Sequence, residues 1–261
     1  AGLPSGAYNV VTGITAAPGI ALTSHPGVDK IAFTGSTPTG IAVGRAALGN
    51  MTRLTLELGG KSAQLVFEDA DLDTAVAGVL NGVFVGSGQT CMAGGRLLVH
   101  EEVHDEVVER LVERANAIRL GPSSDPLTQM GPLITRTQQQ QVLRYIDTAL
   151  HQGATLACGG REPADHDGPY VEATILTGVR PEMELAQQEV FGPVLGVTTF
   201  SSEDEAVALA NDSQFGLAAG VWTNDVHRAH RVAHQLRAGT VWINTYRVFS
   251  PGAPFGGFGL S

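Results

Sequence analysis

Short apolar runs alternate with amphipathic segments along this chain. Residues 30–33 and 53–56 have the pattern of strands, and Gly40–Leu48 between them has the pattern of a helix. Parallel strands need a crossover connection, usually a helix, so the alternation predicts βαβ units with parallel strands. A strand is also expected at Tyr8–Val11 and a helix around Ile20–Leu22. The sequence therefore predicts an α/β fold.

The same alternation continues after residue 60 and predicts a second domain. A strand is expected at Ala63–Phe67, and Asp71 is expected to cap the helix that follows. Further strands are predicted at 96–99, 155–158, 194–200, 217–222 and 240–243, and further helices at 104–120, 135–152, 203–211 and 226–236. We therefore expect two domains, residues 1–60 and residues 61–261.

The stretch Gly88–Gly95 places one thiol, Cys91, in a glycine-rich loop directly before the apolar run 97–99. Small residues on both sides would let other molecules approach the sulfur. A thiol is a nucleophile only as the thiolate, and its usual pKa is about 8.5, so the loop must supply amide donors or positive charge. Most cysteines outside disulfides are inert packing, so Cys91 alone does not establish a reactive site.

A second stretch, Glu57–Ser62, follows the strand-like run 53–56. Glu57 stands at the end of that run, beside the two-glycine break Gly59-Gly60. The strand would fix the orientation of a carboxylate at this place, and the two glycines would leave space beside it. Strand-end carboxylates are usually plain surface groups, but a thiol loop and a positioned carboxylate together are less expected by chance. We interpret Cys91 and Glu57 as candidate catalytic residues.

Composition excludes several classes of function. The 261 residues carry a net charge of −10, which argues against nucleic acid and anionic membranes as partners. No apolar run approaches the roughly 18 to 20 residues that span a bilayer. The second cysteine, Cys158, is interpreted as strand packing, so the two cysteines make no disulfide framework. These features predict a cytoplasmic protein.

At this point the chain resembles a known family, the NAD(P)-dependent aldehyde dehydrogenases. The motifs that carry the resemblance are Phe33-Thr34-Gly35-Ser36-Thr37 with Gly40, Glu57-Leu58-Gly59-Gly60-Lys61, Gly88-Gln89-Thr90-Cys91, Glu189-Val190-Phe191-Gly192-Pro193 and Pro254-Phe255-Gly256-Gly257-Phe258. The resemblance covers essentially the whole chain, but only about the C-terminal half of a family member. It implies that residues 1–60 are the C-terminal part of a partial Rossmann-like NAD(P)-binding domain and that residues 61–261 are the catalytic domain.

The resemblance implies oxidation of an aldehyde to a carboxylic acid. Cys91 would attack the carbonyl carbon, and the backbone amide of Cys91 would help to stabilise the oxyanion. After hydride transfer, Glu57 would deprotonate the water that hydrolyses the thioester. The other oxyanion donor of the family is an asparagine that by position precedes Ala1.

The resemblance also implies the cofactor contacts. The expected cofactor-binding residues are Gly35, Ser36, Gly40, Leu58, Glu189 and Phe191. The exposed amides of a helix N-terminus suit an anion such as pyrophosphate, and the Glu189 carboxylate would accept hydrogen bonds from the ribose hydroxyls. The cofactor is NAD or NADP, because the residues that distinguish them lie on a strand that this chain lacks. Thr15 departs from the family's glycine and is expected to crowd the cofactor.

Phe249 and Val85 match positions that line the aldehyde tunnel of the family, and we expect a small-molecule aldehyde as the substrate. A homo-oligomer is expected for a full-length protein. It is left open for this chain, which stops at Ser261 before the strand that family members exchange, and which has Gly259 where the family usually has lysine.

Three alternatives stay open. The chain begins at Ala1 rather than at a methionine, in the middle of a pattern, as an internally cut protein would. It could therefore be a fragment that is inactive or keeps only thiol esterase chemistry. A cysteine-based acyl transferase would need a histidine partner for Cys91, and no histidine lies near it in the sequence. A metal site on His227, His230 and His234 is conceivable, but no other ligand stretch points there, so no metal is expected.

Overall fold

The computed structural model describes residues 2–261. The chain divides into two compact units, one ending at Leu58 and the other running from Gly59 to Ser261. This division lies close to the boundary expected after residue 60. The expectation of an internal cut at Ala1 lies outside the described residues.

The first unit contains one βαβ arrangement, as the sequence predicted. Its elements are α1 (Ala17–Thr23), β1 (Lys30–Thr34), α2 (Thr37–Leu48) and β2 (Arg53–Glu57). Strands β1 and β2 are parallel, with Lys30 paired to Arg53 and Thr34 paired to Glu57. Ser36 caps α2 by accepting a hydrogen bond from the Thr39 amide, and a proline stands in the first turn, where no amide donor is needed.

The strand expected at Tyr8–Val11 was wrong. These residues are exposed and form neither helix nor strand. A strand persists only where a neighbour satisfies its backbone N–H and C=O groups, and in the described part of the first unit β1 and β2 pair only with each other. The apolar pattern was present, but the pairing partner was not.

The second unit is built on a seven-stranded sheet with the order β10-β9-β3-β4-β7-β6-β5. The strands are β3 (Ala63–Val66), β4 (Arg96–His100), β5 (Thr155–Cys158), β6 (Thr174–Thr177), β7 (Val194–Phe200), β9 (Ala218–Trp222) and β10 (Thr240–Ile243). Neighbouring strands are parallel except for the edge pair β5 and β6, which is antiparallel. A small antiparallel pair joins β8 (Phe215–Gly216) to β11 (Phe258–Gly259).

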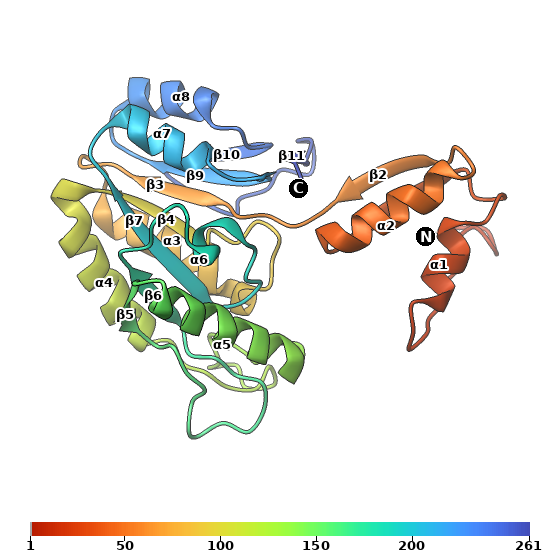
Figure 1. Cartoon of the computed structure of the whole chain (residues 1–261), viewed down its shortest axis with the longest axis horizontal. Helices are drawn as coiled ribbons and strands as arrows, with labels where there is room; N and C mark the ends of the chain where they lie inside the picture. Colours follow the sequence, from red (N-terminus) through yellow and green to blue (C-terminus); the bar gives the residue numbers. More distant parts are fainter. Residues whose placement is uncertain (1) are drawn as a thin grey trace. The chain divides into compact units, whose positions relative to one another are not determined.

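Helices cover both faces of this sheet (Figure 1). They are α3 (Leu72–Phe84), α4 (His104–Asn116), α5 (Arg136–His151), α6 (Glu184–Gln187), α7 (Glu203–Asn211) and α8 (Val226–Gln235), with short 3-10 turns η1 (Val85–Gly88) and η2 (Glu101–Val103). Leu97 and Val99 pack in the core with α3 and α4, whereas Leu98 packs in the core with α7 and α8. Strand β4 is therefore buried on both faces, as expected for a parallel sheet covered by helices.

Several elements differ from the prediction. Helix α4 ends at Asn116 rather than at residue 120, because Leu120 forms a β-bridge with Met130. Strand β6 and helix α6 were not predicted. Helix α6 has only four residues, about one turn, which is too short to show a helical periodicity. Asp71 caps α3 as expected, accepting hydrogen bonds from the amides of Asp73 and Thr74. Within residues 2–261, no helix has the length and apolar character needed to cross a membrane.

Three loops meet at one end of the sheet. Strand β4 lies between β3 and β7, with Ala63 paired to Arg96 and Arg96 paired to Gly196. Because these three strands are parallel and in register, the segments that precede them share the same edge. Those segments are residues 59–62, 89–95 and 188–193, which contain three of the motifs singled out in the sequence.

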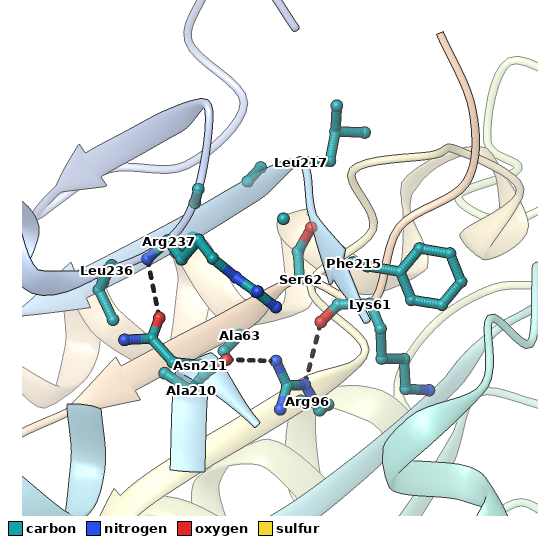
Figure 2. Close-up of a pocket in the computed structure, with 14 residues that line it drawn as sticks. Lys61, Ser62, Ala63, Arg96, Ala210, Asn211, Phe215, Leu217, Leu236 and Arg237 are labelled. Carbon is teal, nitrogen blue, oxygen red and sulfur yellow. Dashed lines mark hydrogen bonds between the residues drawn. The ribbon is translucent and has the colours of Figure 1, made fainter. Parts of the chain in front are cut away.

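Arg96, the first residue of β4, connects this edge to α7 (Figure 2). Its guanidinium is buried, with the residue 8% exposed. It donates to the carbonyl oxygens of Lys61 (Nε, 3.0 Å), Leu209 (Nη1, 2.9 Å) and Ala210 (Nη2, 2.7 Å). Leu209 and Ala210 belong to the last turn of α7, where carbonyls lack a full set of helical partners; the Leu209 carbonyl also accepts from the Asp212 amide at 3.3 Å. One side chain thus joins β4, the start of β3 and the end of α7.

Replacing Arg96 by methionine should destabilise the protein by about 3 kcal/mol, because buried carbonyls would lose their donors. The free energy of unfolding in urea measures this loss. Arg161→Met is the matched control, since Arg161 is exposed and pairs only with Glu172; its effect should stay within about 0.5 kcal/mol. Equal effects of the two substitutions would contradict the structural role of Arg96.

Candidate active site

Glycines let the three loops touch backbone to backbone. A Cβ on Gly60 would overlap the carbonyl oxygen of Cys91, and a Cβ on Gly88 would overlap the carbonyl oxygen of Gly192. A Cβ on Gly59 would overlap the carboxylate of Glu189. The structure therefore brings Cys91 and Glu189 together at a site where no larger residue fits.

Cys91 follows a left-handed turn at the end of α3. Gly86, Ser87 and Gly88 have φ angles of 69°, 57° and 70°, a conformation that costs energy for a residue with a side chain. The Ser87 hydroxyl donates to the carbonyl oxygen of Gly131 at 2.8 Å, which holds the turn. The thiol of Cys91, beyond the turn, is half-buried. The turn redirects the chain from the helix into the thiol loop.

Glu189 and Phe191 lie on the loop before β7. The Gly60 amide donates to Oε1 of Glu189 at 3.2 Å. Burial raises the pKa of Glu189, while the Gly60 hydrogen bond and the charge of Lys61 oppose that shift. Phe191 has a left-handed φ of 53° and keeps its side chain partly exposed. A carboxylate and an aromatic ring are thus both fixed beside the thiol loop.

Lys61 is a buried cation that the sequence presented only as part of a motif. The residue is 5% exposed, and it takes part in none of the ion pairs formed within residues 2–261. Burial, together with repulsion from Arg96, lowers its pKa to about 7, and the charge of Glu189 opposes the shift. Lys61 and Glu189 line the same small cavity behind the thiol loop. In the sequence, the one signal that Lys61 is buried was its position just before a strand that is buried along its whole length.

Arg247 connects Val85, one of the two residues expected to line the aldehyde tunnel, to the thiol loop. Arg247 Nη1 donates to the carbonyl oxygen of Val85 at 3.2 Å and lies 3.5 Å from Oγ1 of Thr90. Val85 is 44% exposed and Phe249 is 49% exposed. The Phe249 ring also meets the Phe255 ring edge-on, with centroids 5.7 Å apart. Sequence reasoning singled out neither Arg247 nor Phe255 for this place.

The other predicted site residues belong to the first unit. The Gly35 amide donates to the carbonyl oxygen of Glu57 at 3.1 Å, so the end of β1 is tied to the end of β2. Gly40 packs on Leu58, where a Cβ would lie 2.5 Å from Leu58 Cδ2. Gly35, Ser36, Gly40, Glu57 and Leu58 are therefore gathered at the carboxyl ends of β1 and β2.

A cleft of about 740 Å³ opens between α1 and α2 in the same unit. It is lined mainly by small and apolar residues, Thr15 among them. The hydroxyl of Thr15 accepts a hydrogen bond from the Ala17 amide at 3.3 Å. Thr15 therefore lines this cleft, and its hydroxyl turns to the backbone of its own segment.

Two further groups carry no role in this site. His227, His230 and His234 lie on α8, and residues 2–261 contain no group of three or more His, Cys, Asp or Glu side chains arranged to hold a metal. Cys158 is buried in edge strand β5, with its thiol 3.7 Å from the carbonyl oxygen of Ala173. Burial raises the pKa of the Cys158 thiol, which keeps it protonated.

Lys61→Met should stabilise the protein at low pH more than at high pH. The unfolded lysine has a pKa of 10.5 and the folded one about 7, so the unfolded state binds the extra proton between these values. The stability of the wild type therefore rises with pH through this window. We expect the advantage of the variant to shrink by about 2 kcal/mol between pH 6.5 and 8.5. Urea unfolding at both pH values measures it.

Lys30→Met is the control for this pH effect, because Lys30 is the other lysine of the chain and is exposed. Its effect on stability should not change between the two pH values. A constant effect of Lys61→Met would show that Lys61 is fully charged in the folded protein, contrary to the prediction.

Gly88→Ala should destabilise the protein more than Gly178→Ala. Both glycines have similar left-handed φ angles, 70° and 65°, but only Gly88 would press a Cβ onto backbone, whereas Gly178 has open space. The shared backbone cost is about 1 to 2 kcal/mol, and we expect Gly88→Ala to lose about 2 kcal/mol more. Urea unfolding compares the two. Equal losses would mean that the thiol loop and the Gly192 loop are not packed together.

The comparisons with known proteins identify the family of this chain. The model of the aldehyde dehydrogenase family matches residues 1–261. Betaine aldehyde dehydrogenases of Brucella anthropi and Mesorhizobium japonicum are 48% and 49% identical over 99% of this chain. The chain spans about half (53%) of the length of these curated relatives.

Solved structures are similar as well. The NAD-dependent aldehyde dehydrogenase of Sinorhizobium meliloti is 41% identical, with a TM-score of 0.98 over 100% of this chain and 52% of that one. Betaine aldehyde dehydrogenase of Staphylococcus aureus, solved in complex with NAD+, is 41% identical, with a TM-score of 0.91 over 93% of this chain and 48% of that one. The resemblance and the α/β fold drawn from the sequence are confirmed, and the chain belongs to the aldehyde dehydrogenase family.

Proposed function

We propose that the protein oxidises an aldehyde to a carboxylic acid, with NAD or NADP as the hydride acceptor. The observation that carries the proposal is the convergence of Gly59-Gly60, Cys91 and Glu189 at the amino ends of three adjacent strands. A half-buried thiol with open backbone around it suits attack on a small carbonyl compound. Family membership supports the same reaction class.

In the proposed reaction, the Cys91 thiolate adds to the carbonyl carbon of the aldehyde and forms a thiohemiacetal. The backbone amide of Cys91 donates to the oxyanion. When bound, the nicotinamide ring supplies the hydride acceptor, and a thioester then remains on Cys91. Glu57 takes a proton from the water that attacks the thioester, the acid leaves, and the Cys91 sulfur is released for the next turnover.

The residues present fit a dinucleotide. One oxygen of Glu189 is held by the Gly60 amide, and the carboxylate has remaining lone pairs to accept hydrogen bonds from a ribose diol. Phe191 offers a partly exposed ring beside it. In the first unit, Gly35 and Ser36 lie at the start of α2, where free amides and the helix dipole favour a phosphate, and Gly40 and Leu58 pack together behind them. The cleft between α1 and α2 has the volume of a small-molecule site.

Further parts of the proposal rest on the same family membership. Residues 1–60 would be the C-terminal part of the NAD(P)-binding domain, and residues 61–261 would be the catalytic domain. Val85 and Phe249 would line the path of a small-molecule aldehyde. A full-length protein would work in the cytoplasm as a homo-oligomer, without nucleic acid, membrane or metal as a partner.

Cys91→Ser should abolish the reaction. NAD(P)-dependent growth of absorbance at 340 nm, with a panel of aliphatic and aromatic aldehydes, should fall more than about a thousandfold, because serine is a far weaker nucleophile. Cys158→Ser is the control and should keep the rate, since Cys158 is buried in β5.

The same assay separates the alternative, a protein without dehydrogenase activity that keeps at most thiol esterase chemistry. No turnover, together with rapid labelling of Cys91 by iodoacetamide, would favour that alternative. Full activity in Cys91→Ser would contradict both.

A further inference from the structure

Two consecutive residues hold the backbone on both sides of Cys91. The Tyr246 hydroxyl donates to the carbonyl oxygen of Met92 at 2.9 Å. Arg247, the next residue, places Nη1 3.5 Å from Oγ1 of Thr90 and 3.2 Å from the carbonyl oxygen of Val85. Thr90 and Met92 are the immediate neighbours of Cys91. The guanidinium of Arg247 is therefore held next to Thr90, the residue that precedes the proposed nucleophile Cys91.

Within residues 2–261, Arg247 forms no ion pair with a carboxylate. Most arginines in residues 59–261 pair with Asp or Glu side chains. The exceptions are Arg96 and Arg237, whose hydrogen bonds go to backbone carbonyls, and Arg247. A guanidinium has five N–H donors and stays charged at any working pH. The hydrogen bonds of Arg247 use only Nη1, so Nε and Nη2 keep donors for another molecule.

The backbone of Arg247 is held in an unusual conformation. Its φ of 64° lies in the left-handed region, which costs a residue with a side chain energy and persists only where the surroundings fix it. The half-buried Arg247 is followed at once by the exposed side chains of Val248 and Phe249. The guanidinium therefore contacts the thiol loop, and Phe249, proposed to line the aldehyde path, follows two residues later in the chain.

We propose that Arg247 binds an anionic group of the substrate, so that the preferred aldehydes carry a carboxylate. This inference rests on the proposed function and narrows its substrate class. The whole chain carries a net charge of −10, so an anionic aldehyde needs a local cation to enter. A bidentate guanidinium is the side chain best suited to hold a carboxylate. The same charge repels a trimethylammonium aldehyde, the substrate named for the Brucella and Mesorhizobium relatives.

Alkylation of Cys91 by iodoacetate and by iodoacetamide tests the charge directly. The two reagents deliver similar groups, but only iodoacetate is an anion. We expect the ratio of the two rates to fall about tenfold in Arg247→Gln, in the protein at its natural length, because the loss of one charge-assisted hydrogen bond affects only the anionic reagent. Mass spectrometry of the peptide that contains Cys91 reports the labelling.

Glutamine keeps an amide donor for the Val85 carbonyl, so Arg247→Gln removes the charge with the least change to the loop. Arg247→Lys should restore most of the ratio. Arg161→Gln is the matched control, because Arg161 is exposed and pairs with Glu172, and it should leave the ratio unchanged. An unchanged ratio in Arg247→Gln, or an equal slowing of both reagents, would overturn the proposal and leave Arg247 only a support of the loop.

Steady-state kinetics gives the second readout. In the wild type, kcat/KM for 4-oxobutanoate should exceed kcat/KM for its methyl ester and for betaine aldehyde. Arg247→Gln should lower kcat/KM about tenfold for 4-oxobutanoate only. A wild type that prefers betaine aldehyde would overturn the inference. If no aldehyde is oxidised, the proposed function fails, while the alkylation ratio still decides whether Arg247 attracts anions to Cys91.

Discussion

The buried guanidinium of Arg96 is the interaction on which the arrangement of the candidate site depends. Burial lowers its pKa to about 10, so it stays charged near neutrality. Its hydrogen bonds go to carbonyl oxygens of Lys61, Leu209 and Ala210, and the negative end of the α7 dipole further stabilises the cation. Because these acceptors are backbone atoms, Arg96 ties the loop before β3 and the end of α7 to the first residue of β4. Gly60 and Cys91 meet in the two loops that this connection supports.

The site in the second unit lies at the end of the sheet opposite to the usual one. Ligands of open α/β sheets commonly bind outside the carboxyl ends of the strands, and Gly35 and Glu57 of the first unit obey that rule. The loops that hold Cys91 and Glu189 precede β4 and β7 instead. Helix α3 therefore reaches the thiol loop with its C-terminus, the negative end of its dipole. Such a site must obtain positive charge from side chains, and Arg247 contacts the thiol loop at Thr90.

The sequence predicted the elements better than their contacts. Helices with a clear cap and a long apolar face, such as α3 behind Asp71, were placed within a residue. The strand at Tyr8–Val11 was wrong because strand pattern does not report whether a pairing partner exists. The contact between Gly88 and Gly192 could not be derived, because it arises only when β4 and β7 become neighbours in the sheet. Cys91 was singled out from local pattern and Glu189 from the family resemblance, whereas Arg96, Lys61 and Arg247 owe their contacts to burial and distant partners.

The two cysteines carry the same side chain but lie in different surroundings. Cys158 ends edge strand β5, where the core covers its thiol, its neighbour is a carbonyl oxygen, and burial raises its pKa. Cys91 lies in a loop that regular structure cannot cover, because the left-handed turn 86–88 ends α3 before it and glycines follow it. The glycines leave space beside the Cys91 sulfur, and the guanidinium of Arg247 lies 3.5 Å from the hydroxyl of the neighbouring Thr90. The surroundings of this thiol are thus set by the turn, the glycines and a distant arginine, all of which the fold must position.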